Sequence, residues 1–202
     1  MASEINLQVL ETEGVNWTLE KAARDVWQNF FDAAGGTLDG VTVRLNDTGA
    51  SQSLLISHSA SYDVWPLLYT GGTTKQNDPF AAGRFGRGAK DFAMLFLRDF
   101  GFNSVEFRSK DWTLDYVLKP VGDEVPEGLR GLFAVVDTAE GIEGNSLQLL
   151  TQKLKDVLAI TQAKDLFYHS ENPDFQEPTL DVKGVGGFKL LDGGGSFSSP
   201  KG

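Results

Sequence analysis

The sequence predicts an α+β fold, a two-layer sandwich in which a mixed, mostly antiparallel sheet carries helices on one face. The main reason is the order of the expected elements: a strand, a long helix, a hairpin, a short helix, a loop leading into another helix, and then a run of strands. A second reason is size and composition, because 202 residues with 41% hydrophobic side chains are enough for one well-buried core.

The first long helix is expected over residues 19–34, where apolar side chains recur at helical spacing. Thr18 is the expected N-cap, because its hydroxyl can accept a hydrogen bond from an unpaired N–H group of the first turn. Gly35 and Gly36 follow the pattern and end it, as glycine commonly does at helix C-termini. Residues 5–10 alternate between apolar and polar side chains and predict a short strand before this helix.

An antiparallel hairpin is expected after the helix. Residues 41–45 and 53–57 carry strand patterns, and the turn residues 46–49 lie between them. Residues 62–69 then predict a short helix with Pro66 in or near its first turn, where proline is tolerated.

The second half of the chain is expected to be rich in strands. Three strands separated by turns are predicted at residues 102–107, 112–118 and 132–136. Leucines at helical spacing predict a packing helix over residues 147–160, and residues 182–191 predict one more strand.

Charge and composition narrow the classes of partner. The chain has 28 acidic and 18 basic side chains, a net charge of -10, which disfavours direct nucleic-acid binding. It contains no cysteine, which fits a reducing compartment, and no apolar run approaches the roughly 18 residues of a membrane span. With no signal-peptide pattern at its start, the chain is expected to be cytoplasmic and not associated with a membrane.

A row of polar side chains lies opposite the apolar stripe of the first long helix. At about 100° per residue, Asp25, Asn29 and Asp32 fall within one arc of the helix surface. By pattern alone, a solvated polar face is the commoner explanation of such a row. The alternative is a set of oxygen ligands one helical turn apart, which suits Mg²⁺ because this ion takes few protein ligands and keeps waters and phosphates.

A glycine-rich loop precedes the second long helix. Residues 83–88 contain three glycines, and residues 91–97 are almost wholly apolar, so the loop is expected to lead into a buried helix. The unpaired N–H groups of a helix start, with glycines that let an anion approach, suit phosphate binding. The motif is weak evidence by itself. The order of elements does not fit a Rossmann fold, and the P-loop pattern GxxxxGK[ST] is absent.

Taken together, these motifs resemble those of the GHKL ATPases, the superfamily of DNA gyrase, the large heat-shock chaperone, sensor histidine kinases and MutL mismatch-repair proteins. Residues 25–33 (DVWQNFFDA) resemble the N-box E-x-x-x-N-x-x-D-A, and residues 72–75 (GTTK) resemble the start of the ATP lid. Residues 83–90 (GRFGRGAK) resemble the second glycine box GxFGxGxK, which is the most specific match. The resemblance covers residues 20–100 clearly and implies a Bergerat-type sandwich.

The resemblance also implies roles for individual residues. Asn29 would hold Mg²⁺, and Asp25 stands where ATPase members carry the glutamate that activates water as a general base. The nucleotide-binding residues implied by the motifs are Asn29, Asp32, Ala33, His58, Thr73, Thr74, Lys75, Gly83, Arg84, Phe85, Gly86, Arg87, Gly88 and Lys90.

Two positions depart from the family pattern. Asp25 is one methylene shorter than glutamate, and a base displaced by about 1 Å can lose about 10²-fold in rate. The first glycine box, D-x-G-x-G, is replaced by residues 58–62 (HSASY), so that His58 stands at the position of the adenine-binding aspartate. These departures put both turnover and adenine specificity in question.

The expected function is ATP binding with slow Mg²⁺-dependent hydrolysis, in which closure of the lid drives an ATP-dependent homodimer or larger complex. The alternative is a degenerate GHKL fold that acts as a non-catalytic protein-interaction module. Residues 1–190 are expected to form one nucleotide-binding domain, and residues 191–202 a flexible tail or the start of a further domain.

Overall fold

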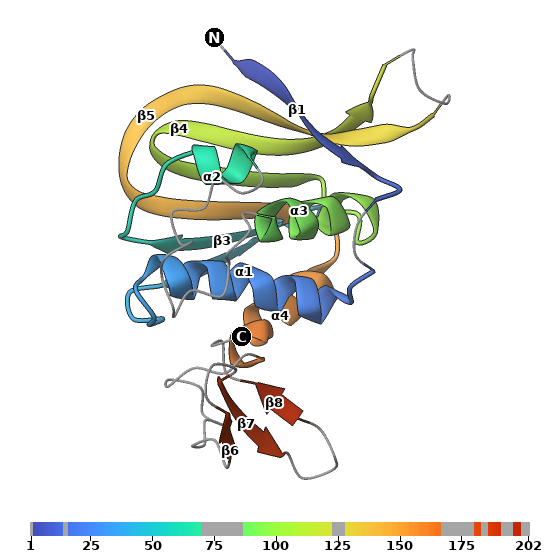
Figure 1. The fold of residues 1–202 in the computed structure, drawn as a ribbon. Coiled ribbons are helices and arrows are strands. Elements are labelled where there is room, and N and C mark those ends of the chain that lie inside the picture. The colour runs from blue at the N-terminus through green and yellow to red at the C-terminus, as the bar shows by residue number, and fades with distance from the viewer. Residues whose placement is uncertain are drawn as a thin grey trace.

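A computed structural model describes residues 2–13, 16–69, 87–122 and 128–166, and three short strands between residues 180 and 198. In this part of the chain the fold is α+β, with an open antiparallel sheet of five strands and four α-helices (Figure 1). The predicted fold class is confirmed at this level. Every strand pair in the five-stranded sheet is antiparallel.

The longest strand organises the five-stranded sheet. β5 (Arg130–Thr151) pairs along one edge with β4 (Ser104–Pro120). Along its other edge, β1 (Ser3–Leu10) pairs with the first half of β5, and β3 (Gln52–His58) pairs with the second half. β2 (Thr42–Asp47) pairs only with β3 in the sheet order and completes the predicted hairpin.

β4 and β5 bend together so that each strand doubles back on itself (Figure 1). The bend coincides with an irregularity in the pairing at Lys110, which has a positive φ of 51°. It brings the two ends of β4 together: the ring centroids of Phe107 and Tyr116 lie 6.0 Å apart. Ser104 Oγ also donates a hydrogen bond of 3.2 Å to Asp115 Oδ1.

The prediction of separate strands at residues 102–107 and 112–118 was therefore wrong, because β4 continues through both. Polar residues 108–111 resemble a turn in the sequence, but in the structure they form a bulge. The predicted helix over residues 147–160 was also wrong in its first part. Leu147 and Leu149 are buried on alternate positions of β5, and helix α4 (Leu154–Gln162) begins only after the strand ends.

Helix α1 (Leu19–Ala33) confirms the predicted helix and its cap. Thr18 Oγ1 accepts a hydrogen bond of 3.3 Å from the N–H of Lys21. The apolar side of α1 is buried, and Trp27 Nε1 donates a 2.6 Å hydrogen bond to the carbonyl of Ile160 in α4. Gly35 follows the helix with a φ of +77°, a conformation that glycine adopts without a steric penalty.

Helix α3 (Gly88–Arg98) lies beside α1 and is the more deeply buried of the two (Figure 1). The predicted apolar run of residues 91–97 supplies most of this buried surface. Phe92 and Phe96 of α3 pack against Phe107 and Phe102, with ring centroids 6.0 and 4.8 Å apart. The helix is thereby fixed against the inner side of β4.

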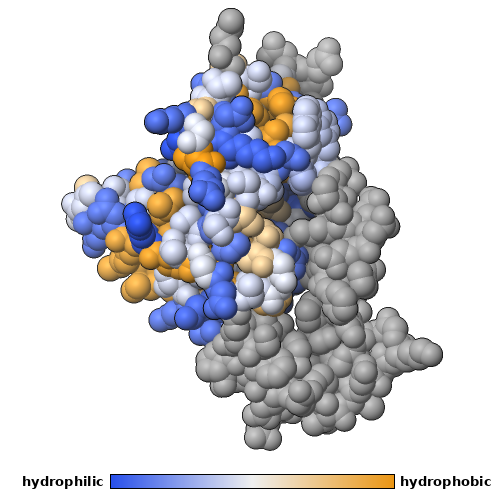
Figure 2. All heavy atoms as spheres, turned by 90° about the vertical axis from the view of Figure 1, so that its left-hand side faces the viewer, coloured by the Kyte–Doolittle hydropathy of each residue, from blue (hydrophilic) through white to orange (hydrophobic). Residues whose placement is uncertain are grey.

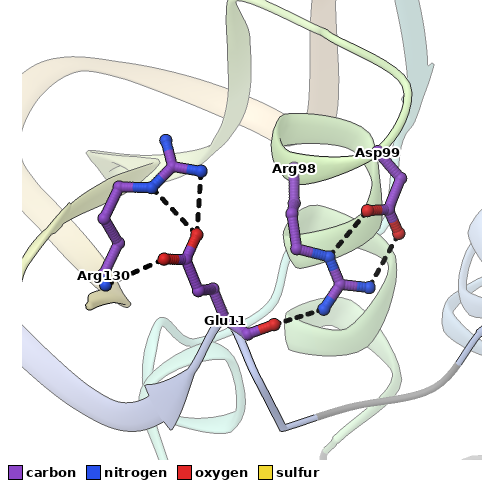
Figure 3. Close-up of polar contacts among 4 residues, drawn as sticks. All are labelled: Glu11, Arg98, Asp99 and Arg130. Atoms are coloured by element: carbon purple, nitrogen blue, oxygen red, sulfur yellow. Dashed lines mark hydrogen bonds and ion pairs between the residues drawn. The ribbon is translucent and has the colours of Figure 1, made fainter. Parts of the chain in front are cut away.

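The last turn of α3 is joined to the sheet by a group of charged side chains (Figure 3). Arg98 bonds both the carboxylate of Asp99 and the backbone carbonyl of Glu11, just after β1. The Glu11 carboxylate in turn accepts bonds from the side chain and the N–H of Arg130, at the start of β5. These bonds, chiefly those from the Arg130 side chain, hold the pKa of Glu11 below its usual value.

Three short strands near the C-terminus form a second sheet of their own. β6 (Leu180–Val182), β7 (Gly186–Leu190) and β8 (Ser196–Ser198) pair in that order, each antiparallel to the next. The strand expected over residues 182–191 corresponds to β7, while β6 and β8 were not predicted. The domain boundary at residue 191 stays a prediction.

Candidate functional site

The polar row of α1 faces the start of α3. Asp25, Asn29 and Asp32 are all half-buried, so the row is not a fully solvated face. Gly88, the first residue of α3, lies beside two of them: a β-carbon there would stand 3.7 Å from Asp25 Oδ2 and 4.0 Å from Asn29 Nδ2. Packing of the two helices therefore brings Gly88, the last glycine of the glycine-box-like segment, beside two residues of the N-box-like segment.

The start of α3 presents backbone N–H groups beside this row. Arg87 is the N-cap residue and makes no side-chain capping hydrogen bond. Its guanidinium instead donates from Nε to Asp91 Oδ1 at 3.1 Å. N–H groups of a first turn without a side-chain cap, at the positive end of the helix dipole, can receive an anion.

Asp25 has an environment that suits a proton acceptor. Burial raises the pKa of its carboxyl above the usual value. Arg24, whose Nη2 lies 3.4 Å from Asp25 Oδ1, opposes that rise, while the charge of Asp91 adds to it. A carboxylate with a raised pKa is a stronger base than an exposed one, as general-base catalysis near neutral pH requires.

Lys90 is fully buried two residues into α3. Its Nζ donates a hydrogen bond of 3.5 Å to the carbonyl of Pro66 in the short helix α2 (Trp65–Leu68). Burial lowers the pKa of its ammonium to about 8, and the nearby carboxylate of Asp91 opposes that fall. The group is therefore still mostly protonated at pH 7 and can contribute positive charge near the first turn.

His58 lies at the end of β3, in a different set of contacts from the α1–α3 site. Its Nδ1 accepts a 3.0 Å hydrogen bond from the N–H of Ala60. A β-carbon at Gly40 would lie 3.7 Å from its Nε2. Neutral His58 thus carries its proton on Nε2, and this edge can donate a hydrogen bond but cannot act as a carboxylate.

Sequence reasoning missed a hydrogen-bond network that fixes the residues after β3. Ser61 Oγ accepts a 3.0 Å bond from the N–H of Gly144 and donates to the carbonyl of the same residue at 3.2 Å. Ser109 Oγ donates to that carbonyl at 2.6 Å and accepts from the N–H of Tyr62. No local pattern reveals this network, because the chain separations reach 83 residues.

Several predicted site residues lie outside the described part of the chain, and their roles stay predictions. These residues are Thr73, Thr74, Lys75, Gly83, Arg84, Phe85 and Gly86. Asp32 and Ala33 are in the last turn of α1, and their roles stay predictions too.

The side chains around Gly88 suit a metal ion that takes few protein ligands. Among the described residues, no group of three or more His, Cys, Asp or Glu side chains is placed to hold a metal. Such a group would be needed for a site built wholly from protein ligands. Mg²⁺ is bound by one or two protein oxygens together with substrate phosphates. The amide nitrogen of Asn29 is the atom nearest to a β-carbon at Gly88, so Asn29 offers its oxygen to an ion there when the amide is turned over.

No protein-family model matches the chain, and no curated protein matches it significantly. Within the described residues, no helix is long and apolar enough to cross a membrane.

Proposed function

We propose that this chain binds Mg·ATP between α1 and the start of α3 and hydrolyses it slowly, as a GHKL-type domain with a Bergerat-type sandwich. The observation that carries the proposal is the position of Gly88 against Asp25 and Asn29. Such chemistry needs a phosphate-binding helix start close to a metal ligand and a base, and the nearness of Gly88 to Asp25 and Asn29 supports this arrangement.

The start of α3 would bind the phosphates. Gly88 has no side chain to block their approach, and the N–H groups of the first turn would donate hydrogen bonds to them. Lys90 and Arg87 place positive charge on the same turn. In the region before α3, Thr73, Thr74, Lys75, Gly83 and Gly86 belong to the same proposal on the strength of the resemblance alone.

Asn29 would hold the metal ion, and Asp25 would take the proton from the attacking water. When bound, Mg²⁺ neutralises the charge of the phosphates and fixes their orientation. The raised pKa of Asp25 favours proton transfer, but its side chain is one methylene shorter than glutamate. Positioning dominates this kind of reaction, so a short base gives slow turnover.

Slow hydrolysis suits a switch rather than a metabolic enzyme. Closure of the lid that begins near residues 72–75 would couple ATP binding to formation of a homodimer or larger complex. The net charge of -10 supports a protein partner rather than direct contact with nucleic acid.

The test is calorimetric titration with Mg·ATP and Mg·GTP, using Asn29→Ala against the wild type. Asn103→Ala is the matched control, because Asn103 is exposed in the loop between α3 and β4. We expect Asn29→Ala to abolish nucleotide binding and Asn103→Ala to leave it unchanged. Equal binding by both variants would contradict the proposed site.

The second candidate is a non-catalytic interaction module on the same fold. His58 favours it, because an imidazole that accepts a hydrogen bond from the N–H of Ala60 stands where the first glycine box has a carboxylate. This candidate predicts no thermal shift with Mg·ATP. A binding protein at 100 times Kd would gain about 2.7 kcal/mol of stability, which is readily measured.

A further inference from the structure

Seven large apolar side chains of the described residues are exposed, and two of them are aromatic. The five aliphatic ones are Val43, Leu45, Leu154, Leu158 and Leu166. The two aromatic ones, Trp65 and Tyr69, are 60% and 51% exposed. On the face turned to the viewer, Figure 2 shows apolar groups in patches that hydrophilic side chains interrupt.

Trp65 and Tyr69 form a stacked pair. Their ring centroids lie 5.7 Å apart and their planes are inclined by 21°. They are one helical turn apart, at the first residue of α2 and just after its end. With more than half of each side chain open to solvent, the pair presents aromatic ring surface outward.

Contacts with the core hold α2 in place, so the aromatic pair has a fixed position. Leu67 and Leu68 are buried in the core, and Tyr116 Oη donates a 2.8 Å hydrogen bond to the carbonyl of Leu67. Lys90 Nζ donates to the carbonyl of Pro66, the residue next to Trp65. A single side chain thus connects the first turn of α3 to the helix that carries the aromatic pair.

We propose that Trp65 and Tyr69 form the platform on which the base of the bound nucleotide stacks. The inference rests on the proposed function, which places phosphates at the start of α3. Lys90 joins the first turn of α3 to Pro66, so the aromatic pair lies one side chain away from the proposed phosphate site, and the base of a nucleotide held there would reach it. Every nucleobase has a π-face that can stack on an aromatic ring.

Stacking of this kind gives affinity with little discrimination between bases. Base–aromatic stacking tolerates any base because it needs a ring face and no particular hydrogen-bonding edge. We therefore expect ATP and GTP to bind within about threefold of each other, since purines offer similar ring area.

The test separates the base from the phosphates. Binding of Mg·ATP and of Mg·tripolyphosphate, which has no base, is measured by calorimetry for the wild type, Trp65→Ala and Trp65→Tyr. Loss of a stacking platform should weaken ATP binding about tenfold to hundredfold in Trp65→Ala and leave tripolyphosphate binding unchanged. Trp65→Tyr should retain most of the ATP affinity, because it keeps an aromatic ring.

Two control variants distinguish failure of the aromatic platform from failure of the nucleotide site. Leu158→Ala removes another exposed apolar side chain, on α4, and should change neither affinity. Asn29→Ala should abolish binding of both ligands, because the metal ion that it removes binds their phosphates. If Asn29→Ala abolishes binding of both ligands but Trp65→Ala changes neither, the platform is refuted and the proposed nucleotide site stands.

Two other outcomes would overturn the platform. An equal loss of both ligands in Trp65→Ala would show that the residue supports the site as a whole, which overturns a base platform. Absence of binding by the wild type would overturn the nucleotide proposal and the platform together.

Discussion

Gly88 of α3 lies directly against Asp25 of α1, where a β-carbon at position 88 would stand 3.7 Å from the Asp25 carboxylate. The backbone of Gly88 is not in the left-handed region, so its conformation does not require glycine. What the missing side chain provides is space beside Asp25 and Asn29. That space lies at the start of a helix, where an anion would approach.

Gly88→Ala should therefore separate stability from binding. The added methyl makes ordinary contacts at 3.7 and 4.0 Å, and alanine restricts the unfolded chain, so the unfolding free energy should rise by up to about 1 kcal/mol. The same methyl occupies the approach to the helix start, and Mg·ATP affinity should fall at least about tenfold. Urea unfolding and calorimetry on the same preparation test both expectations. Unchanged ATP affinity would show that phosphates do not approach along this side.

Asp25 provides a test of turnover. Asp25→Asn should keep nucleotide binding and lower turnover about 10²-fold or more, because the amide cannot accept the proton. Asp25→Glu restores the missing methylene and should raise turnover by up to about 10²-fold. Single-turnover phosphate release with saturating Mg·ATP measures both. Equal rates in Asp25→Asn and the wild type would assign the proton to another acceptor.

The pH profile of wild-type turnover gives an independent check on the same residue. Asp25 must be deprotonated to act as a base, so turnover should rise with pH through its pKa. Burial raises that pKa above the usual 3.8, and the acidic limb of the profile should shift upward accordingly. In Asp25→Asn this limb should disappear.

Local patterns predicted those parts of the fold that depend on neighbours in sequence. The apolar period and Thr18 predicted α1 correctly, and the turn at residues 46–49 predicted the β2–β3 hairpin. The bend of β4 was missed because the positive φ of Lys110 is rare for a residue other than glycine and is not indicated by the local sequence. Leu147 was assigned to a helix because leucines at residues 147, 150 and 154 also fit a helical period.

The candidate site was predictable in composition but not in geometry. Spacing placed Asp25 and Asn29 on one face of α1, but only helix packing places Gly88 beside them, 63 and 59 positions later in the chain. The stacked pair of Trp65 and Tyr69 was not predicted, because the exposure of an aromatic side chain depends on what the rest of the fold covers.

The network around Gly144 leads to a prediction about stability. Gly144 has a φ of +90°, and a β-carbon there would stand 2.2 Å from the carbonyl oxygen of His58. Gly144→Ala should lower the unfolding free energy by about 3 kcal/mol or more, since it adds a backbone clash to an unfavourable conformation. Gly49→Ala is the matched control, because Gly49 has a φ of +77° with open space around it. Gly49→Ala should lower the unfolding free energy by about 1 kcal/mol. Equal losses for the two variants in chemical denaturation would show that the backbone between β3 and β5 moves to relieve the clash.

The doubled-back ends of β4 bring two carboxyl groups together, and this arrangement should make stability depend on pH. Burial raises the pKa of both Glu106 and Asp115, and the charge of Asp115 raises that of Glu106 further. Ser104 and the N–H of Val105 bond the Asp115 carboxylate and partly oppose its rise. Since the folded pKa values lie above the unfolded ones, the contribution of these groups to stability is complete below pH 3.8 and is lost as pH rises through the folded values.

Glu106→Gln removes one charge from that pair and should raise Tm at pH 7 by about 2 °C, a modest gain because the site is partly solvated. Near pH 4 the gain should vanish, because the pKa of Glu106 lies above 4.5 and this carboxyl is then mostly protonated in the wild type. Glu143→Gln, at an exposed position of β5, should change Tm little at either pH. The Tm values must be compared between variants at the same pH. The pKa of Glu11 is lowered in the folded state, so Glu11 makes the protein less stable as the pH falls. If the gain in Tm of Glu106→Gln is the same at pH 4 as at pH 7, the gain comes from packing and not from the removed charge.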